Sequence, residues 1–367
     1  MKKRKKDGKE KQKKKKGKLF LGLTFLFLVV VVSGILCYRK VYIYRSRFSQ
    51  LDLAVNEYLE NRGFPVLEKK IKKKGVYYFF PQTERIVDIP FNCSLDKFSE
   101  EIEEHFGTFE GSFLRLKEKN KSDIYHLEAS LGFDNYLAQR LDFILRKAKL
   151  ALLIDDFGYR DDTVVDLFLN KIDIPLTISI IPGTPFAQSI AKKAEKSGNE
   201  VILHLPMQPQ GDFVNDYRWI ILKGMSPAEI KETFQEALRD VPQATGVNNH
   251  MGSLITTRPA EMKPLLEEIK KAQLYFVDSK TASNSIAYSL AQKMGVRTAQ
   301  NKMFLDNEKR IDYIRERFQK MLVSLNKSEK VIALGHVNQV TGEAILNFIS
   351  HLDKRKVKLV YISEIVE

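Results

Sequence analysis

From about Lys149 to the C-terminus, short apolar segments alternate with amphipathic stretches of helical length. Such alternation is typical of βα units, in which helices cover a parallel sheet or barrel. The strands expected are Leu150–Ile154, Leu176–Ile181, Val201–Leu205, Gly246–Asn248, Leu274–Val277, Met303–Leu305, Val331–Leu334 and Leu359–Ile362. The sequence therefore predicts an α/β fold over residues 150–367, a (β/α) barrel of seven to eight strands.

Polar side chains stand where these strands end. They are Asp155 and Asp156 after the first strand, His204 in the third, Asn248, Asn249 and His250 after the fourth, Asp278 and Ser279 after the fifth, and His336 after the seventh. Barrel enzymes build their active sites at the carboxyl ends of the strands, so we expect these groups to lie together. Taken one at a time, the positions have simpler explanations, such as an Asp-Asp-x-Gly turn, an interior histidine or a helix cap.

One carboxylate and two neutral imidazoles form a common catalytic zinc site. A bound metal lowers the pKa of water and polarises a carbonyl, while a nearby carboxylate can accept the proton of the water. Successive residues leaving a strand point in different directions, so one aspartate of the pair Asp155 and Asp156 can bind the metal while the other acts as base. His336 from another strand can protonate a leaving nitrogen. We therefore expect a divalent metal, with zinc the best fit to these ligands.

Seven segments resemble the divergent polysaccharide deacetylase family, in the family's order along residues 150–367. They are ALLIDDFGYR (151–160), PLTISIIPGTPFA (175–187), VILHLPMQP (201–209), GVNNHMGS (246–253), YFVDSKT (275–281), FLDN (304–307) and IALGH (332–336). The resemblance implies a (β/α) barrel, often incomplete, and metal-dependent removal of N- or O-acetyl groups from sugars.

The resemblance also implies roles: Asp155 as general base, Asp156 as metal carboxylate, His204 as first metal histidine and His336 as acid. In the broader polysaccharide deacetylase superfamily, two metal histidines usually stand four residues apart. Four residues after His204 this chain instead has Gln208.

His250 is the candidate replacement. The usual arginine that orients the base has no clear counterpart, and Asp278 could occupy the later aspartate position. Asn249, Asp278 and Ser279 are candidates for contacts around the metal or to the substrate.

Ahead of the barrel, Leu19–Tyr38 is an uncharged run of 20 residues, about the length that crosses roughly 30 Å of hydrocarbon. Residues 1–18 carry 12 basic side chains, so the N-terminus should stay in the cytoplasm. We expect a single-pass signal anchor in the cytoplasmic (inner) membrane, with residues 39–367 outside the cytoplasm. A cleaved signal peptide is the alternative, but the run is long for one and no A-x-A-like site follows it.

The formal charge of +14 lies mostly in this tail, where 12 basic side chains face only 2 acidic ones. Nucleic-acid binding by the folded part is therefore disfavoured, whereas the tail can contact anionic lipid headgroups. The two cysteines, Cys37 and Cys93, provide no disulfide framework.

Between anchor and barrel we expect a stalk helix over 39–62, a small α+β module over 63–132 and a linker helix over 133–149. The module should contain a strand at Val76–Phe80, a helix after Ser94 and a hairpin over 112–131. We expect His105 and His126 in this module to be ordinary surface or half-buried histidines, because neither has a polar residue at a sequence spacing typical of a site. The sequence does not indicate which protein or glycan, if any, the module binds.

The leading hypothesis is a membrane-anchored, extracytoplasmic, metal-dependent deacetylase of N-acetylated or O-acetylated cell-envelope polysaccharide. A catalytically silent envelope-glycan-binding or scaffold protein is the alternative, because Gln208 replaces a metal histidine. Hydrolysis of another amide or ester is a third possibility, since the metal chemistry does not specify the acyl group.

Overall fold

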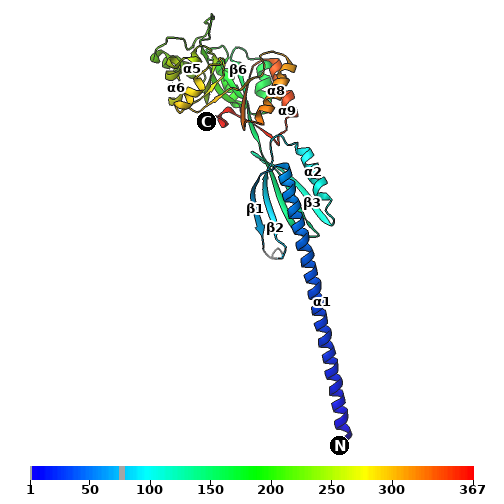
Figure 1. Ribbon diagram of the computed structural model, residues 1–367. Helices are drawn as coiled ribbons and strands as arrows, with labels where there is room; N and C mark the ends of the chain where they lie inside the picture. Colours follow the sequence, from blue (N-terminus) through cyan, green and yellow to red (C-terminus); the bar gives the residue numbers. More distant parts are fainter. Residues whose placement is uncertain (1, 74–78) are drawn as a thin grey trace. The chain divides into compact units, whose positions relative to one another are not determined.

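The computed structural model describes residues 2–73 and 79–367, and the side chains from residue 12 onward (Figure 1). The chain divides into two compact units, Met1–Leu145 and Arg146–Glu367. Most of the strand expected at Val76–Phe80 lies outside the described residues.

The first unit begins with helix α1 (Lys2–Arg62), which joins the basic tail, the apolar run and the expected stalk into one helix. It ends before Gly63, whose positive φ of 63° terminates the helix. The apolar run Leu19–Tyr38 is solvent-exposed, and the helix is long and apolar enough to cross a membrane. This is compatible with a single-pass anchor or a signal sequence.

A five-stranded sheet and a second helix complete the first unit. The strands follow the order β1 (Val66–Lys72), β2 (Gln82–Asp88), β5 (Tyr136–Arg146), β4 (Ile124–Phe133) and β3 (Ser112–Asn120), and the helix is α2 (Leu95–Gly107). Buried residues of α1, such as Leu51 and Val55, share one core with Phe98 and Ile102 of α2 and with the sheet.

One prediction about this unit is wrong. The linker helix expected over 133–149 is instead strand β5 followed by the start of β6, because β5 lies between β2 and β4 and buries alternate residues such as Leu141 and Phe143. His126 is half-buried, and its Nδ1 lies 3.0 Å from Oδ1 of Asp142 on β5.

The second unit is one parallel sheet of nine strands. Its strands are β6 (Ala148–Phe157), β7 (Thr177–Ile180), β8 (Glu200–Met207), β9 (Gly246–Met251), β10 (Tyr275–Asp278), β11 (Thr298–Gln300), β12 (Met303–Phe304), β13 (Lys330–His336) and β14 (Val357–Val360). The order is β11-β10-β9-β8-β7-β6-β13-β12, and β14 also pairs with β6. All eight expected strands are present and β11 is additional. Among the described residues no ladder joins β11 to β12, so the sheet curls without closing.

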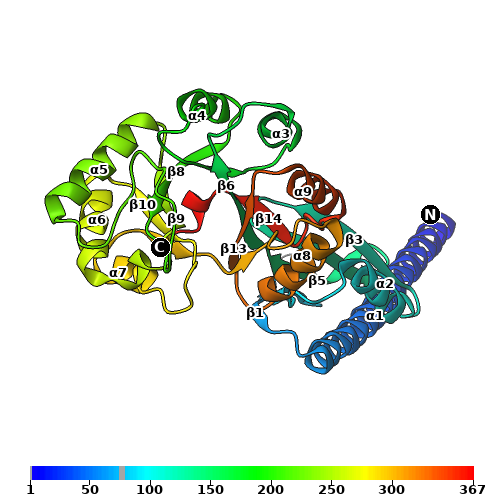
Figure 2. The same cartoon turned by 90° about the horizontal axis from the view of Figure 1, so that it is seen from above.

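Helices cover the outside of this sheet (Figure 2). They are α3 (Thr163–Asp166), η2 (Leu167–Lys171), α4 (Ala187–Lys196), α5 (Pro227–Asp240), η3 (Ile255–Thr257), α6 (Pro259–Lys271), α7 (Ala287–Lys293), α8 (Ile311–Leu325) and α9 (Gln339–His351). The short helix η4 (Ile362–Glu364) lies inside the curled sheet, where Ile362 shares a core with Ala151 and Val277. Ser226 and Glu229 form a capping box at the start of α5. The predicted α/β fold is confirmed, as a curled parallel sheet.

Strand register brings the polar residues to one edge of the sheet. His336 on β13 is paired with Asp155 on β6, and His250 on β9 is paired with Pro206, two residues after His204 on β8. Because the strands are parallel, their carboxyl ends meet at this edge.

Candidate metal centre

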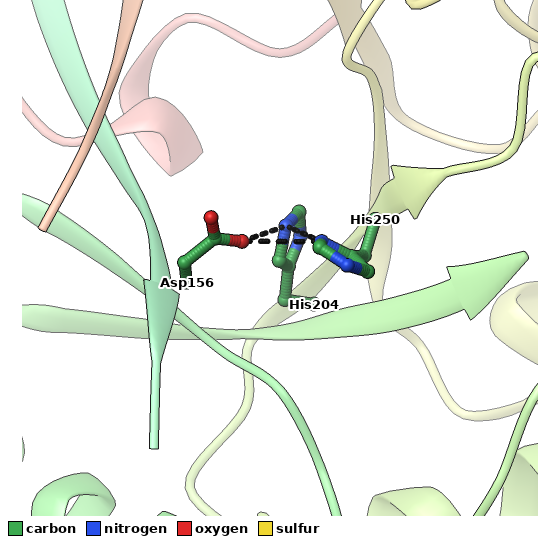
Figure 3. Close-up of side chains that lie close together, drawn as sticks. All are labelled: Asp156, His204 and His250. Carbon is green, nitrogen blue, oxygen red and sulfur yellow. Dashed lines mark hydrogen bonds and ion pairs between the residues drawn. The ribbon is translucent and has the colours of Figure 1, made fainter. Parts of the chain in front are cut away.

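Asp156, His204 and His250 converge from β6, β8 and β9 (Figure 3). The Oδ1 atom of Asp156 lies 3.3 Å from Nε2 of His204 and 3.1 Å from Nδ1 of His250. The two imidazole nitrogens are 3.0 Å apart. Ligand atoms bound to one tetrahedral zinc ion at about 2.0–2.2 Å are separated by about 3.3–3.6 Å, so these three atoms need to move apart only slightly to hold a single ion.

A local distortion of β6 directs Asp156 toward the histidines. Its φ is 68°, in the left-handed region that a residue with a side chain rarely adopts, and the pairing of β6 with β7 shifts between Ile154 and Phe157. A bulge of this kind re-aims side chains at the end of a strand, and such strain is common at functional sites.

The hydrogen-bond partners determine which nitrogen of each imidazole faces the cluster. Nδ1 of His204 lies 2.8 Å from Oδ1 of Asn248, and an amide oxygen only accepts, so Nδ1 carries the hydrogen and Nε2 is left with its lone pair. Nε2 of His250 lies 2.8 Å from the hydroxyl of Tyr217, which leaves Nδ1 for the cluster. Oδ1 of Asp156 is buried and accepts no well-aligned hydrogen bond. Two lone pairs and an unpartnered carboxylate oxygen therefore face one point, an arrangement that suits a cation.

The pKa shifts of the cluster residues also indicate that a cation is favoured at this point. Burial would raise the pKa of Asp156, but the imidazoles of His204 and His250 outweigh burial and hold that pKa well below its usual range. Burial lowers the pKa of His204, yet Asp155 and Asp156 together raise it above its ordinary value. Positive charge is therefore favoured at the cluster, whether a proton or a metal ion supplies it.

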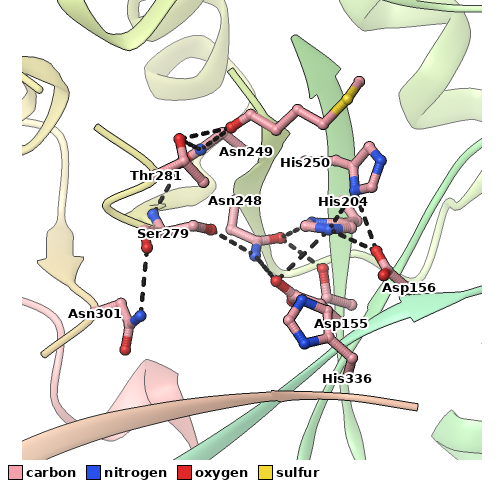
Figure 4. A network of polar contacts seen from close by, with 12 residues as sticks. Asp155, Asp156, His204, Asn248, Asn249, His250, Ser279, Thr281, Asn301 and His336 are labelled. Carbon is pink, nitrogen blue, oxygen red and sulfur yellow. Dashed lines mark hydrogen bonds and ion pairs between the residues drawn. The ribbon is translucent and has the colours of Figure 1, made fainter. Parts of the chain in front are cut away.

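Asn248 connects this cluster to Asp155 (Figure 4). The Nδ2 group of Asn248 donates to both carboxylate oxygens of Asp155, at 3.0 and 3.2 Å, and to Oγ of Ser279 at 3.1 Å. Its Oδ1 also accepts from Oγ of Ser179 at 2.5 Å. Burial raises the pKa of Asp155, which is 2% exposed. Asn248 thus orients both Asp155 and His204.

Across the sheet edge, His336 is held by Asp306, a buried residue that follows β12. Burial alone would lower the pKa of His336, but the hydrogen bond and negative charge of Asp306 raise it to about 9. His336 is therefore an imidazolium at neutral pH, beside a buried carboxylate at Asp155.

The structure places the other expected site residues in supporting positions. Oδ1 of Asn249 accepts from the backbone N–H of Ser279 at 2.9 Å, and its Nδ2 donates to the carbonyl of Met251 at 2.7 Å. Asp278 accepts from Oγ of Ser285 at 2.7 Å and from Nε2 of Gln300 at 3.2 Å. Gln208 accepts a backbone hydrogen bond from Lys223. These contacts hold loops around the centre.

Two residues of the site, Asp306 and Tyr217, were not predicted from the sequence, and Asn248 was expected among the polar strand ends without a role of its own. Asp306 was noted only as part of the FLDN segment, although it follows an expected strand as the other acidic residues do. Tyr217 lies in the irregular segment between β8 and α5, where no local pattern distinguishes it.

Comparison with known proteins supports the same family. The family model for divergent polysaccharide deacetylases matches residues 152–366. The uncharacterized protein YibQ of Escherichia coli K12 is 33% identical over 204 residues, which is 56% of this chain and 63% of YibQ. An uncharacterized protein of Haemophilus influenzae is 32% identical over 194 residues, 53% of this chain and 68% of the relative. The match thus spans less than two thirds of the length of YibQ.

Among solved structures, the uncharacterized protein ATU2773 of Agrobacterium tumefaciens C58 has a similar fold. It superposes with a TM-score of 0.57 at 18% identity, covering 60% of this chain and 90% of that protein. This likeness supports the fold of the second unit.

Proposed function

Because the chain belongs to the divergent polysaccharide deacetylase family, we propose that it is a metal-dependent hydrolase that removes acetyl groups from an N- or O-acetylated polysaccharide of the cell envelope. The observation that carries the proposal is the cluster of Asp156, His204 and His250, with Asp155 and His336 at the same sheet edge. The same centre could also hydrolyse other amides or esters, because the metal chemistry does not specify the acyl group.

Asp156, His204 and His250 are the residues that would hold the metal. One carboxylate oxygen and two imidazole nitrogens suit zinc. When bound, a divalent cation supplies polarisation of the acyl carbonyl and lowers the pKa of water, so that water attacks at neutral pH.

Asp155 and His336 would move the protons. Asp155, buried and oriented by Asn248, accepts a proton from the attacking water. The imidazolium of His336 donates its proton to the leaving nitrogen, or oxygen in an ester, as the bond to the acyl carbon breaks. The products are acetate and a free amine or hydroxyl on the sugar.

Helix α1 supports a location at the membrane. Its apolar segment Leu19–Tyr38 is exposed and follows 12 basic side chains in residues 1–18. An anchor with a cytoplasmic N-terminus would place residues 39–367 in the envelope, where such a polysaccharide is found.

The test is acetate release by the full chain, purified in detergent and loaded with zinc. N-acetylated and O-acetylated glycans and peptidoglycan are supplied in parallel, with Asp155→Asn as control. We expect release from at least one glycan, reduced about 10²–10⁴-fold by Asp155→Asn while zinc remains bound. Zinc binding and glycan binding without acetate release would instead identify a silent glycan-binding protein, and release only from other amides or esters would change the substrate class.

A further inference from the structure

The segment between β8 and α5 carries Tyr217 to the outer side of His250. The Tyr217 hydroxyl lies 2.8 Å from Nε2 of His250, and the ring centroids are 5.3 Å apart at an interplanar angle of 61°. The opposite nitrogen of the ring, Nδ1, faces Asp156 and His204. Tyr217 therefore contacts a proposed metal ligand on the side away from the metal.

We propose that Tyr217 is a positioning residue for the metal centre: its hydroxyl accepts the Nε2 hydrogen of His250, so the neutral ring binds the metal through Nδ1. This inference rests on the proposed metal-dependent function. A neutral imidazole carries one hydrogen, and the partner of that nitrogen decides which nitrogen is free to bind. Without the hydroxyl, His250 can place the hydrogen on either nitrogen and its ring is held less firmly.

Gln208 begins this segment and hydrogen-bonds to residues near its other end. It is the residue that stands where the superfamily has its second metal histidine. The backbone N–H of Gln208 donates to the carbonyl of Ile221 at 2.9 Å, and its side-chain Oε1 accepts from the backbone N–H of Lys223 at 2.9 Å. The N–H of Ile221 in turn donates to the carbonyl of Pro206 at 3.0 Å. Gln208 thus ties both ends of the segment that delivers Tyr217.

The middle of the segment packs on the turn after β7. Gly183 in that turn has a φ of 78°, and a Cβ at this position would lie 2.9 Å from Cβ of Arg218 and 3.3 Å from the ring of Trp219. Arg218 and Trp219 directly follow Tyr217, so this close approach holds the backbone beside Tyr217 in place. The loss of the usual histidine and the presence of this segment are then parts of one arrangement: His250 replaces the ligand, and the segment based on Gln208 orients His250.

The experiment measures zinc affinity of the full chain by competition with a chromogenic chelator. Tyr217→Phe removes the hydroxyl and retains the ring, and we expect zinc affinity to fall about 10–100-fold, the range typical of a partner lost from a metal-bound histidine. Tyr288→Phe is the matched control, because it removes a tyrosine hydroxyl that accepts from Gln292 at 2.8 Å on helix α7. The control should bind zinc like the wild type.

Two further measurements separate positioning from a general loss of structure. The metal-free Tyr217→Phe protein should keep a urea midpoint close to that of the Tyr288→Phe control, which also loses one hydroxyl hydrogen bond, and the d–d absorption of its cobalt(II) form at saturation should shift. Gln208→Ala should weaken zinc binding in the same direction, whereas Gln208→Glu, which retains an acceptor for Lys223, should restore it.

Equal zinc affinity for wild type and Tyr217→Phe would overturn this inference and leave the proposed function standing. A wild-type chain that binds no zinc or other divalent metal would overturn both.

Discussion

Asp306 holds His336 with both of its carboxylate oxygens. Oδ1 lies 2.9 Å from Nδ1 of the imidazole, and Oδ2 accepts the backbone N–H of His336 at 2.7 Å. Oδ2 also accepts from the hydroxyl of Thr341 at 2.6 Å. The carboxylate therefore sets both the orientation and the charge of the histidine that is proposed to act as acid.

Replacing Asp306 by Asn should lower the pKa of His336 from about 9 toward its ordinary value. In the folded wild type the raised pKa of His336 contributes stability that is fully present below about pH 6.5 and is lost as pH rises through about 9. The depressed pKa of Asp306 contributes stability present above about pH 3.9 and lost below it.

The stability difference between wild type and Asp306→Asn should therefore be largest near pH 5–6.5 and smaller at pH 10. The measurement is urea unfolding at both pH values, with the exposed Glu308→Gln as control. Over a third of the His336 side chain is exposed, so solvent screens the pair and only the direction is predicted. A difference that grows toward pH 10 would contradict it.

Replacing Asn248 by Ala should weaken both stability and zinc binding. The change leaves Nδ1 of His204 and the carboxylate of Asp155 without a buried partner, at about 1–3 kcal/mol for each unpaired group. Asn301→Ala is the control, because it also removes a buried amide, one that donates to the carbonyl of Ser279 and does not touch the cluster. Chelator competition should show weaker zinc binding for Asn248→Ala alone, and unchanged affinity in that variant would count against its role.

Zinc should raise the thermal midpoint of the second unit. A ligand that binds only the folded state at about 100 times its Kd adds about 2.7 kcal/mol. His204→Ala removes one of the three ligands and should abolish the shift, while His105→Ala on α2 should retain it. Scanning calorimetry with zinc and with EDTA makes the comparison. If the wild-type midpoint is the same in both, the metal centre is refuted.

Arg85 should stabilise the first unit through a buried network. Its side chain is 0% exposed, lies 2.6 Å from Oδ1 of Asp52 on α1 and donates to Asn56 at 2.8 Å. Arg85→Ala should cost about 1–3 kcal/mol, because it leaves buried hydrogen-bond partners such as Gln139 unpaired, whereas Asp52 is 30% exposed and retains Lys69 at 3.6 Å.

Arg140 is the matched control for Arg85. It lies 3.4 Å from Glu84, its side chain is 50% exposed, and Arg140→Ala should cost less than about 1 kcal/mol. Equal urea midpoints for the two variants would show that the network adds no stability.

The barrel strands were predictable because their signal is local. Strand β6 is buried on both faces, so Leu150–Ile154 reads as a continuous apolar run. Strand β5 was missed although one of its neighbours is local: β4 ends at Phe133, and only residues 134–135 separate it from Tyr136 at the start of β5. The other neighbour, β2, lies far along the chain, where Thr83 pairs with Gln139, and this tertiary pairing places a segment expected to be a helix at the centre of a sheet.

For the site, too, the sequence predicted which residues gather, and the tertiary structure decided which of them are in contact. Strand ends predicted that polar residues would gather, and Asp156, His204 and His250 do lie together. The sequence did not distinguish Asn248 from Asn249, since neighbouring residues on a strand face opposite sides and the register selects the one that meets His204. Asp278 lies at a strand end too, yet its carboxylate accepts hydrogen bonds from Ser285 and Gln300.

The sequence by itself determined the family, the parallel sheet and the set of residues from which a site could be built, because apolar runs and the residues at their ends are local features. Only the tertiary structure decided which atoms face one another. The bulge at Asp156, the register that places Asn248 between His204 and Asp155, and the loop that brings Tyr217 to His250 all depend on contacts between segments distant in sequence. Such contacts are set by packing and hydrogen bonding across the fold, which no local pattern encodes.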